Sequence, residues 1–140
     1  MRKPTIINNS IRIPSSEEHL PDVDSFLEGI LRGYGVEETI IADIAISVTE
    51  LVINGIIHGN GSNPDKDVTV AISKKDANVE VVVQDQGDGF NPDEIENPID
   101  AKNLLKEVGR GIFIVKSLMD SVAIDRTTRG TRITITKKVS

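Results

Sequence analysis

The sequence predicts an α+β fold in which helices cover one face of a mixed, mostly antiparallel β-sheet. Residues 131–137 alternate cleanly between polar and apolar side chains, which is typical of a strand with one buried face. Residues 37–58 instead carry apolar side chains at helical spacing. Strands and helices come in runs rather than in regular alternation, and this order favours helices packed on one face of the sheet.

The first half of the chain predicts one strand and two helices. Residues 6–13 have the apolar pattern of a strand. Ser15 to Glu18 has the spacing of a capping box, which begins a helix that ends at Gly33 and Gly35. The second helix covers residues 37–58, and a loop rich in glycine and asparagine follows it.

The second half predicts a hairpin, a loop and three further elements. Residues 68–72 and 79–83 form an antiparallel hairpin, and Val81, Val82 and Val83 look buried on both faces. Residues 91–108 are polar and loop-like, with about the length of an active-site lid. The last elements are a helix and two strands, at 111–119, 122–125 and 131–137.

Length and composition predict a single domain, residues 1–140, with an aliphatic core. The chain is 38% hydrophobic and 27% charged, and only 3% of it is aromatic. Its formal net charge of -6 argues against nonspecific binding to nucleic acid, which requires a basic surface. The absence of cysteine excludes disulfides and thiol chemistry, and two histidines argue against a histidine-built zinc site.

We expect neither a secretory signal nor a membrane span. The basic residues near the N-terminus have no apolar stretch behind them. No apolar run approaches the ~18 residues that cross a bilayer. The sequence therefore predicts a cytoplasmic protein.

The most informative segment covers residues 50–60. Glu50, Asn54 and His58 are four residues apart, so they lie along one face of a helix. An asparagine oxygen is a suitable single protein ligand for Mg²⁺ that is shared with substrate phosphates, and a carboxylate one turn away can deprotonate an attacking hydroxyl. Taken alone, Glu50 and Asn54 are better explained as a solvated helix edge, and His58 as an edge histidine that helps to close the helix.

A second segment, residues 85–90, follows a strand that we expect to be buried. Gly87 and Gly89 allow a tight turn and a close approach of the backbone to a ligand. Asp85, at the end of the strand, can accept a hydrogen bond from the exocyclic amine of adenine. Taken alone, a β-turn that uses Asp and Gly explains the segment equally well.

A third segment, Gly109-Arg110-Gly111, opens the third predicted helix. Backbone N–H groups at the start of a helix bind anions, and Arg110 can bind a phosphate in bidentate fashion. A flexible loop end with a surface arginine is the alternative.

The fourth segment, Gly130-Thr131, begins the last strand. Thr131 can bond the edge of adenine, directly or through water. Its good β propensity explains it at least as well when it is judged alone.

The ordered set of four segments resembles the GHKL ATPase superfamily, which includes gyrase, histidine kinases and mismatch-repair ATPases. Neither a P-loop nor the loops of eukaryotic-type kinases are present. Within the superfamily, the chain is similar to the small bacterial anti-sigma factor serine/threonine kinases. The segments correspond to their N box and three glycine boxes: 50–60, 85–90, 109–112 and 130–131. The resemblance covers nearly the whole chain and implies a two-layer α/β sandwich of the Bergerat type.

The resemblance also implies a role for each matching residue. Glu50 would be the general base, and Asn54 would bind Mg²⁺. The other positions would bind ATP: Asp85, Gly87, Gly89 and Thr131 around the adenine, and Gly109, Arg110 and Gly111 around the phosphates. Gln86 departs from the family pattern, because many relatives have an acidic residue there.

The family further implies an ATP-dependent serine/threonine protein kinase that acts as an anti-sigma factor. Such proteins bind a sigma factor, phosphorylate a small anti-anti-sigma antagonist and are often homodimers. Two alternatives stay open. One is an ATP-gated module that sequesters a partner without kinase activity. The other is a stand-alone histidine-kinase-type catalytic domain, which the absence of a phosphoacceptor helix hairpin before this domain argues against.

Overall fold

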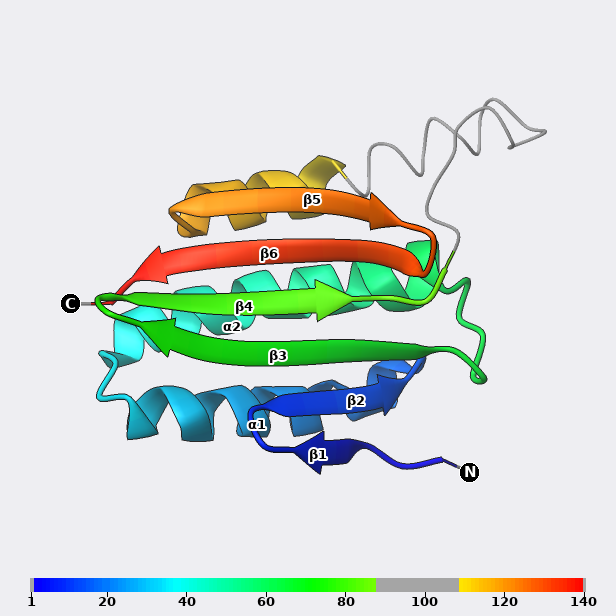
Figure 1. Cartoon of the computed structure of the whole chain (residues 1–140), viewed down its shortest axis with the longest axis horizontal. Coiled ribbons are helices and arrows are strands. Elements are labelled where there is room, and N and C mark those ends of the chain that lie inside the picture. Colours follow the sequence, from blue (N-terminus) through cyan, green and yellow to red (C-terminus); the bar gives the residue numbers. More distant parts are fainter. Residues whose placement is uncertain (1, 88–108, 140) are drawn as a thin grey trace.

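The computed structural model describes residues 2–87 and 109–139. Its strands form one six-stranded sheet in the order β1-β2-β3-β4-β6-β5 (Figure 1). They are β1 (Thr5–Ile7), β2 (Ser10–Pro14), β3 (Asp67–Lys75), β4 (Asn78–Gln84), β5 (Ser121–Thr127) and β6 (Gly130–Lys138). Every neighbouring pair is antiparallel, which is the limiting case of the mostly antiparallel sheet that the sequence predicts.

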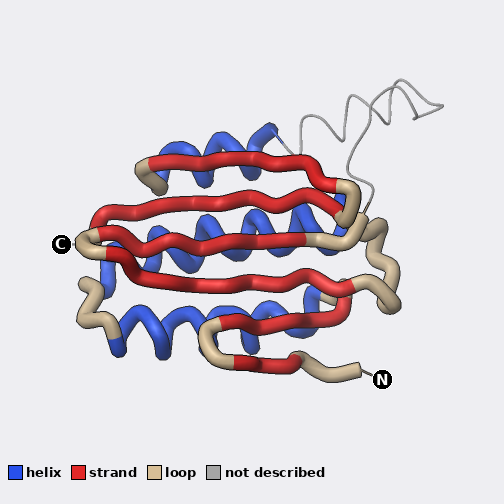
Figure 2. The backbone as a smooth tube through the Cα atoms, in the orientation of Figure 1, coloured by secondary structure: helices blue, strands red, loops and turns tan. Residues whose placement is uncertain are grey.

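The described helices cover one face of this sheet (Figures 1 and 2). A short 3-10 helix, η1 (Glu17–His19), leads into α1 (Leu20–Gly33). The next helix, α2 (Glu38–Asn54), continues without a break into a π-helical turn, η2 (Gly55–Gly59). A further helical segment covers residues 109–118 and lies behind β5 in Figure 1.

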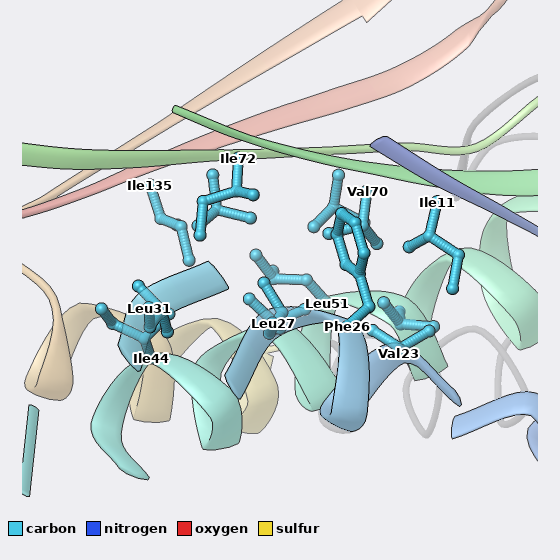
Figure 3. Close-up of a cluster of buried hydrophobic side chains, with 14 of the residues drawn as sticks. Ile11, Val23, Phe26, Leu27, Leu31, Ile44, Leu51, Val70, Ile72 and Ile135 are labelled. Atoms are coloured by element: carbon cyan, nitrogen blue, oxygen red, sulfur yellow. The ribbon is translucent and has the colours of Figure 1, made fainter. Parts of the chain in front are cut away.

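The hydrophobic core lies between the helices and the sheet. Figure 3 shows side chains of α1 and α2 directed toward Val70 and Ile72 of β3 and Ile135 of β6. Burying such a side chain fully contributes about 1.5–3 kcal/mol relative to leaving it exposed. Among the described residues, Phe26 is the one aromatic side chain in this core, as the low aromatic content predicts. The helical contribution has the expected spacing: Val23, Phe26, Leu27 and Leu31 from α1, and Ile41, Ile44, Val48, Leu51 and Val52 from α2.

Two details of the sheet differ from the sequence-based prediction. The single strand predicted over 6–13 is a hairpin of β1 and β2, because Asn8 adopts a left-handed conformation (φ 53°) that reverses the chain. Val82 is half-buried rather than buried, since it lies on the face that no described helix covers. Its neighbours Val81 and Val83 face the core. The other described elements appear where they were predicted, with slightly different bounds.

The continuous helix of α2 and η2 is long and apolar enough, by length and composition alone, to cross a membrane. It has 22 residues, and its most apolar 18-residue stretch has a mean hydropathy of 1.9. The sequence predicted no apolar run that approaches the length of a membrane span. In the structure this helix is the core helix of the domain, because Ile44, Val48 and Leu51 are almost completely buried against the sheet.

Candidate functional site

Asp85 lies at the centre of the candidate site, immediately after β4, and only 7% of it is exposed. Its Oδ1 accepts the backbone N–H groups of Gly87 at 3.1 Å and of Thr131 at 3.0 Å. Its Oδ2 accepts no hydrogen bond from the described residues. Burial raises the pKa of the Asp85 carboxyl above its ordinary value, and the hydrogen bonds from Thr131 and Gly87 oppose that rise.

Three glycines let backbone segments pack closely around Asp85. A Cβ on Gly59 would lie 2.1 Å from Asp85 Oδ2, and a Cβ on Gly130 would lie 2.1 Å from the Asp85 carbonyl oxygen. A Cβ on Gly87 would lie 1.6 Å from the carbonyl oxygen of Gly59. The end of η2, the turn after β4 and the start of β6 can therefore meet around Asp85 only because these residues lack side chains.

A cavity of about 140 Å³ lies beside Asp85. Its apolar walls come from both layers of the fold: Leu51, Val83, Ile112, Ile124 and Ile133. Its polar lining comes from five side chains: Asn54, His58, Asp85, Arg126 and Thr131. A dry cavity of about this size holds one flat ring such as benzene. A buried carboxylate in its wall favours a heteroaromatic ring that carries an N–H donor.

Glu50 and Asn54 face Gly111 across the gap between α2 and the helical segment 109–118. A Cβ on Gly111 would lie 3.1 Å from Asn54 Nδ2 and 3.3 Å from Glu50 Oε2. Asn54 Nδ2 is buried and has no hydrogen-bond partner among the described residues. An unpaired buried donor is costly, and an oxygen-rich ligand would remove that cost.

This arrangement fits Mg²⁺ held together with phosphate. The Nδ2 of Asn54 can donate to a phosphate oxygen and leave Oδ1 for the ion. Among residues 2–87 and 109–139, no group of three or more His, Asp and Glu side chains can hold a metal. An ion at Asn54 would therefore take its remaining ligands from water and from the substrate, as Mg²⁺ commonly does.

Asn60 fixes the turn that carries Asp85. Its Nδ2 donates to Ser15 Oγ and to the Asp67 carbonyl oxygen, both at 2.9 Å, and its Oδ1 accepts the backbone N–H of Gln86 at 2.8 Å. Gln86 Oε1 in turn accepts the backbone N–H of Asp67 at 2.6 Å. An acidic residue at this position would supply the same kind of acceptor, which explains how the chain tolerates glutamine there.

The structure brings most of the predicted site residues together, namely Glu50, Asn54, Asp85, Gly87, Gly111 and Thr131. Gly109 and Arg110 are exposed, and they are already helical although the helix was predicted from Gly111. Neither lines the cavity, so their contact with phosphates stays a prediction. Gly89 and the predicted loop 91–108 lie outside the described residues.

Some residues of the site were not predicted. His58 was interpreted as an edge histidine, yet it lines the cavity, and its spacing of four from Asn54 was the available signal. Gly59 and Gly130 lie in quoted motifs, but their close approach to Asp85 depends on tertiary packing. Arg126 carried no sequence signal, because its place in the cavity depends on how β5 pairs with β6.

Comparison with known proteins identifies the family. Residues 13–137 match the family described as histidine kinase-like ATPase domain. The chain belongs to this family. The matched residues include Asn54, Asp85 and Thr131 of the candidate site.

Its relatives lie in the branch that the sequence predicts. The anti-sigma F factor of Bacillus cytotoxicus is 36% identical over 103 residues, which are 71% of this chain and 70% of that protein. Serine-protein kinase RsbW of Bacillus velezensis is 28% identical over 133 residues, which are 91% of this chain and 82% of that protein. The resemblance to anti-sigma factor kinases is thereby confirmed.

Solved structures confirm the fold. The RsbU and RsbW domains of a Mycobacterium tuberculosis protein align with a TM-score of 0.69 at 20% identity, over 99% of this chain and 32% of that chain. A histidine kinase domain from Erythrobacter litoralis aligns with a TM-score of 0.56 at 19% identity, over 91% of this chain and 62% of that chain. This chain therefore spans only part of each of these two proteins, and the likeness concerns the two-layer fold alone.

Proposed function

We propose that the protein is an ATP-dependent serine/threonine protein kinase that acts as an anti-sigma factor. The observation that carries the proposal is the buried carboxylate of Asp85 in the wall of a mostly apolar cavity, held on one oxygen by Gly87 and Thr131. Such a carboxylate recognises a flat ring that bears an amine, as adenine does. The names of the relatives, serine-protein kinase and anti-sigma F factor, support the reaction and the role.

The nucleotide would occupy the site from the cavity outward. The adenine amine would donate to Asp85, and the ring would pack against aliphatic side chains such as Ile133. The phosphates would extend toward Asn54 and Gly111, where Asn54 would hold Mg²⁺. The ion supplies positive charge that offsets the charge of the phosphates. Gly109 and Arg110, on the same helical segment as Gly111, would contact the phosphates as well.

Glu50 would act as the general base at the phosphate end of the site, where its Oε2 lies beside Gly111 and Asn54. The hydroxyl oxygen of an acceptor serine or threonine would form a bond to the γ-phosphorus. The bond from that phosphorus to the β–γ bridging oxygen would break, and ADP would leave. Glu50 would accept the hydroxyl proton.

The proposed acceptor is a small anti-anti-sigma antagonist, and the proposed second partner is a sigma factor in the cytoplasm. A homodimer is also proposed. The edge strand β1 supports it, since Ile6 and Ile7 are 59% and 66% exposed there and an open apolar edge favours pairing with another chain. Sedimentation velocity tests the dimer, and a monomer at tens of micromolar would rule it out.

Phosphotransfer is tested with γ-labelled ATP and Mg²⁺ added, with the protein, to an extract of its own host. Wild type is compared with Glu50→Gln and with Glu80→Gln, an exposed residue of β4 away from the site. We expect acid-stable label on one small protein with wild type and with Glu80→Gln, and none with Glu50→Gln.

The other outcomes separate the alternatives. Acid-labile label would point to phosphohistidine and therefore to a stand-alone histidine-kinase-type domain. No label, in a preparation that binds ATP, would favour a module that sequesters its partner. Equal labelling by Glu50→Gln would exclude Glu50 as the base.

A further inference from the structure

Arg126 of β5 is a charged residue that lines the cavity, and none of the roles predicted from the sequence involves it. It is the cross-strand partner of Thr131 in the β5–β6 pair, so the two side chains lie on the same face of the sheet. Both residues line the cavity. The backbone of Thr131 in turn exchanges hydrogen bonds with Asp85. Asp85, Thr131 and Arg126 therefore form a row that runs from the end of β4 across β6 to β5.

The Arg126 guanidinium has no hydrogen-bond or ion-pair partner among the described residues. Other arginines of the sheet do have one. Arg132 contacts Asp125 at 2.9 Å, and Arg12 contacts Asp67 at 3.3 Å. The other lining residues of the β5–β6 pair are its partner Thr131, which is uncharged, and the aliphatic Ile124 and Ile133, so none of them can offset its charge. An unpaired, planar cation beside an apolar cavity is well placed to contact what fills that cavity.

Two parts of a nucleotide attract a guanidinium, namely the face of the base and the phosphates. The position of Arg126 in the sheet favours a contact with the base. Neighbouring strands lie about 5 Å apart, so Arg126 lies only two strand spacings from the carboxylate that would read the adenine amine. The residues proposed for the phosphates, Asn54 and Gly111, instead belong to the helical layer.

We propose that Arg126 is a base-contacting residue whose guanidinium plane stacks on the purine ring and sets the affinity for adenine independently of the number of phosphates. This inference rests on the proposed function, because it requires adenine to bind at Asp85. It assigns a contact to a residue outside the four motif segments. It also implies that the affinities for ADP and for ATP fall by the same factor when this contact is removed.

The test is isothermal titration of adenosine, ADP and ATP into the full-length protein. Four proteins are compared: wild type, Arg126→Ala, Arg126→Lys and Arg129→Ala. Arg129 is the matched control, because it lies in the same β5–β6 hairpin and does not line the cavity. Lysine keeps the charge but has no plane to stack on a ring. Thermal unfolding of each variant verifies that the fold is retained.

We expect Arg126→Ala to raise the Kd of all three ligands by the same factor, about three- to thirty-fold. Arg126→Lys should recover little of that loss, and Arg129→Ala should match wild type. Unchanged affinities in Arg126→Ala would overturn the inference while leaving the kinase proposal intact. A loss that grows from adenosine to ATP, or full recovery by lysine, would show a phosphate contact and overturn it too. If wild type bound none of the three ligands, the proposed function itself would fail.

Discussion

The carboxylate of Asp85 accepts the backbone N–H of Thr131 at 3.0 Å, although the two residues are 46 positions apart in the chain. The backbone N–H of Asp85 returns a hydrogen bond to the Thr131 carbonyl oxygen at 3.1 Å. The pair joins the end of β4 to the start of β6. It fixes one carboxylate oxygen by geometry and leaves the other available to a ligand.

Replacing Asp85 by asparagine should weaken ATP binding without unfolding the protein. The carboxamide would keep an acceptor oxygen for Gly87 and Thr131, but its Nδ2 would replace Oδ2, and an N–H donor cannot accept a hydrogen bond from the adenine amine. Hydrogen bonds to charged groups contribute about 1.5–3 kcal/mol, which predicts a roughly 10- to 150-fold rise in Kd. Calorimetric titration measures it. The control is Asp125→Asn, which removes an exposed carboxylate of β5, and equal affinities of Asp85→Asn and wild type would contradict the proposed adenine contact.

Asp85 should make the free energy of unfolding depend on pH. Its pKa is raised in the folded state, mainly by burial, so the unfolded chain loses this proton at a lower pH than the folded chain. Stability from the protonated form is thus fully present below the unfolded pKa and is lost as pH rises through the folded pKa. Chemical denaturation of wild type and Asp85→Asn at several pH values measures this difference.

Relative to Asp85→Asn, the free energy of unfolding of wild type should fall as pH rises above the ordinary aspartate range. ATP affinity of wild type should rise over the same interval, because the ionised carboxylate accepts from the amine. Parallel stability curves for the two proteins would show that Asp85 does not titrate differently on folding.

Gly111→Ala should impair catalysis by displacing two side chains. The new Cβ would lie 3.1 Å from Asn54 Nδ2 and 3.3 Å from Glu50 Oε2, so one or both must shift by a few tenths of an ångström. We expect a fall in the phosphotransfer rate of about ten-fold or more, since small displacements at a reacting centre are costly. Gly29→Ala is the control, because Gly29 lies in α1 outside the site and a Cβ there meets no described atom within 4 Å. Equal rates for the two variants would argue against a role for this contact.

Gly59→Ala should destabilise the fold at the site. Its Cβ would lie 2.1 Å from Asp85 Oδ2, a separation that real atoms do not adopt, so the turn or the carboxylate must move. We expect a loss of roughly 1–3 kcal/mol in the free energy of unfolding, as for other overpacked positions. Gly29→Ala, in the interior of α1 with no atom within 4 Å of the new Cβ, should instead add roughly 0.5–1 kcal/mol. Urea denaturation of both variants decides the sign of each effect.

Most of the fold follows from patterns that neighbouring residues determine. The helical spacing that predicts α2 and the strict alternation that predicts β6 are both found, because burial of one face requires those periods. The β1–β2 hairpin was missed, since its reversal depends on the backbone conformation of Asn8, which composition alone did not indicate. Val82 was misjudged, because a run of three valines does not say how many faces of a strand are covered.

The candidate site, too, was predicted from the sequence only in part. The sequence by itself determined the family, the acid at the end of β4, and the Glu50–Asn54 spacing on one helix face, because motif chemistry depends on short separations along the chain. Only the tertiary structure decided that Gly59 and Gly130 close around Asp85, that His58 lines the cavity and that Arg126 joins its wall. The physical reason is strand register: the β4–β6 and β5–β6 pairings bring distant residues into one row, and no local pattern encodes which residues will be partners.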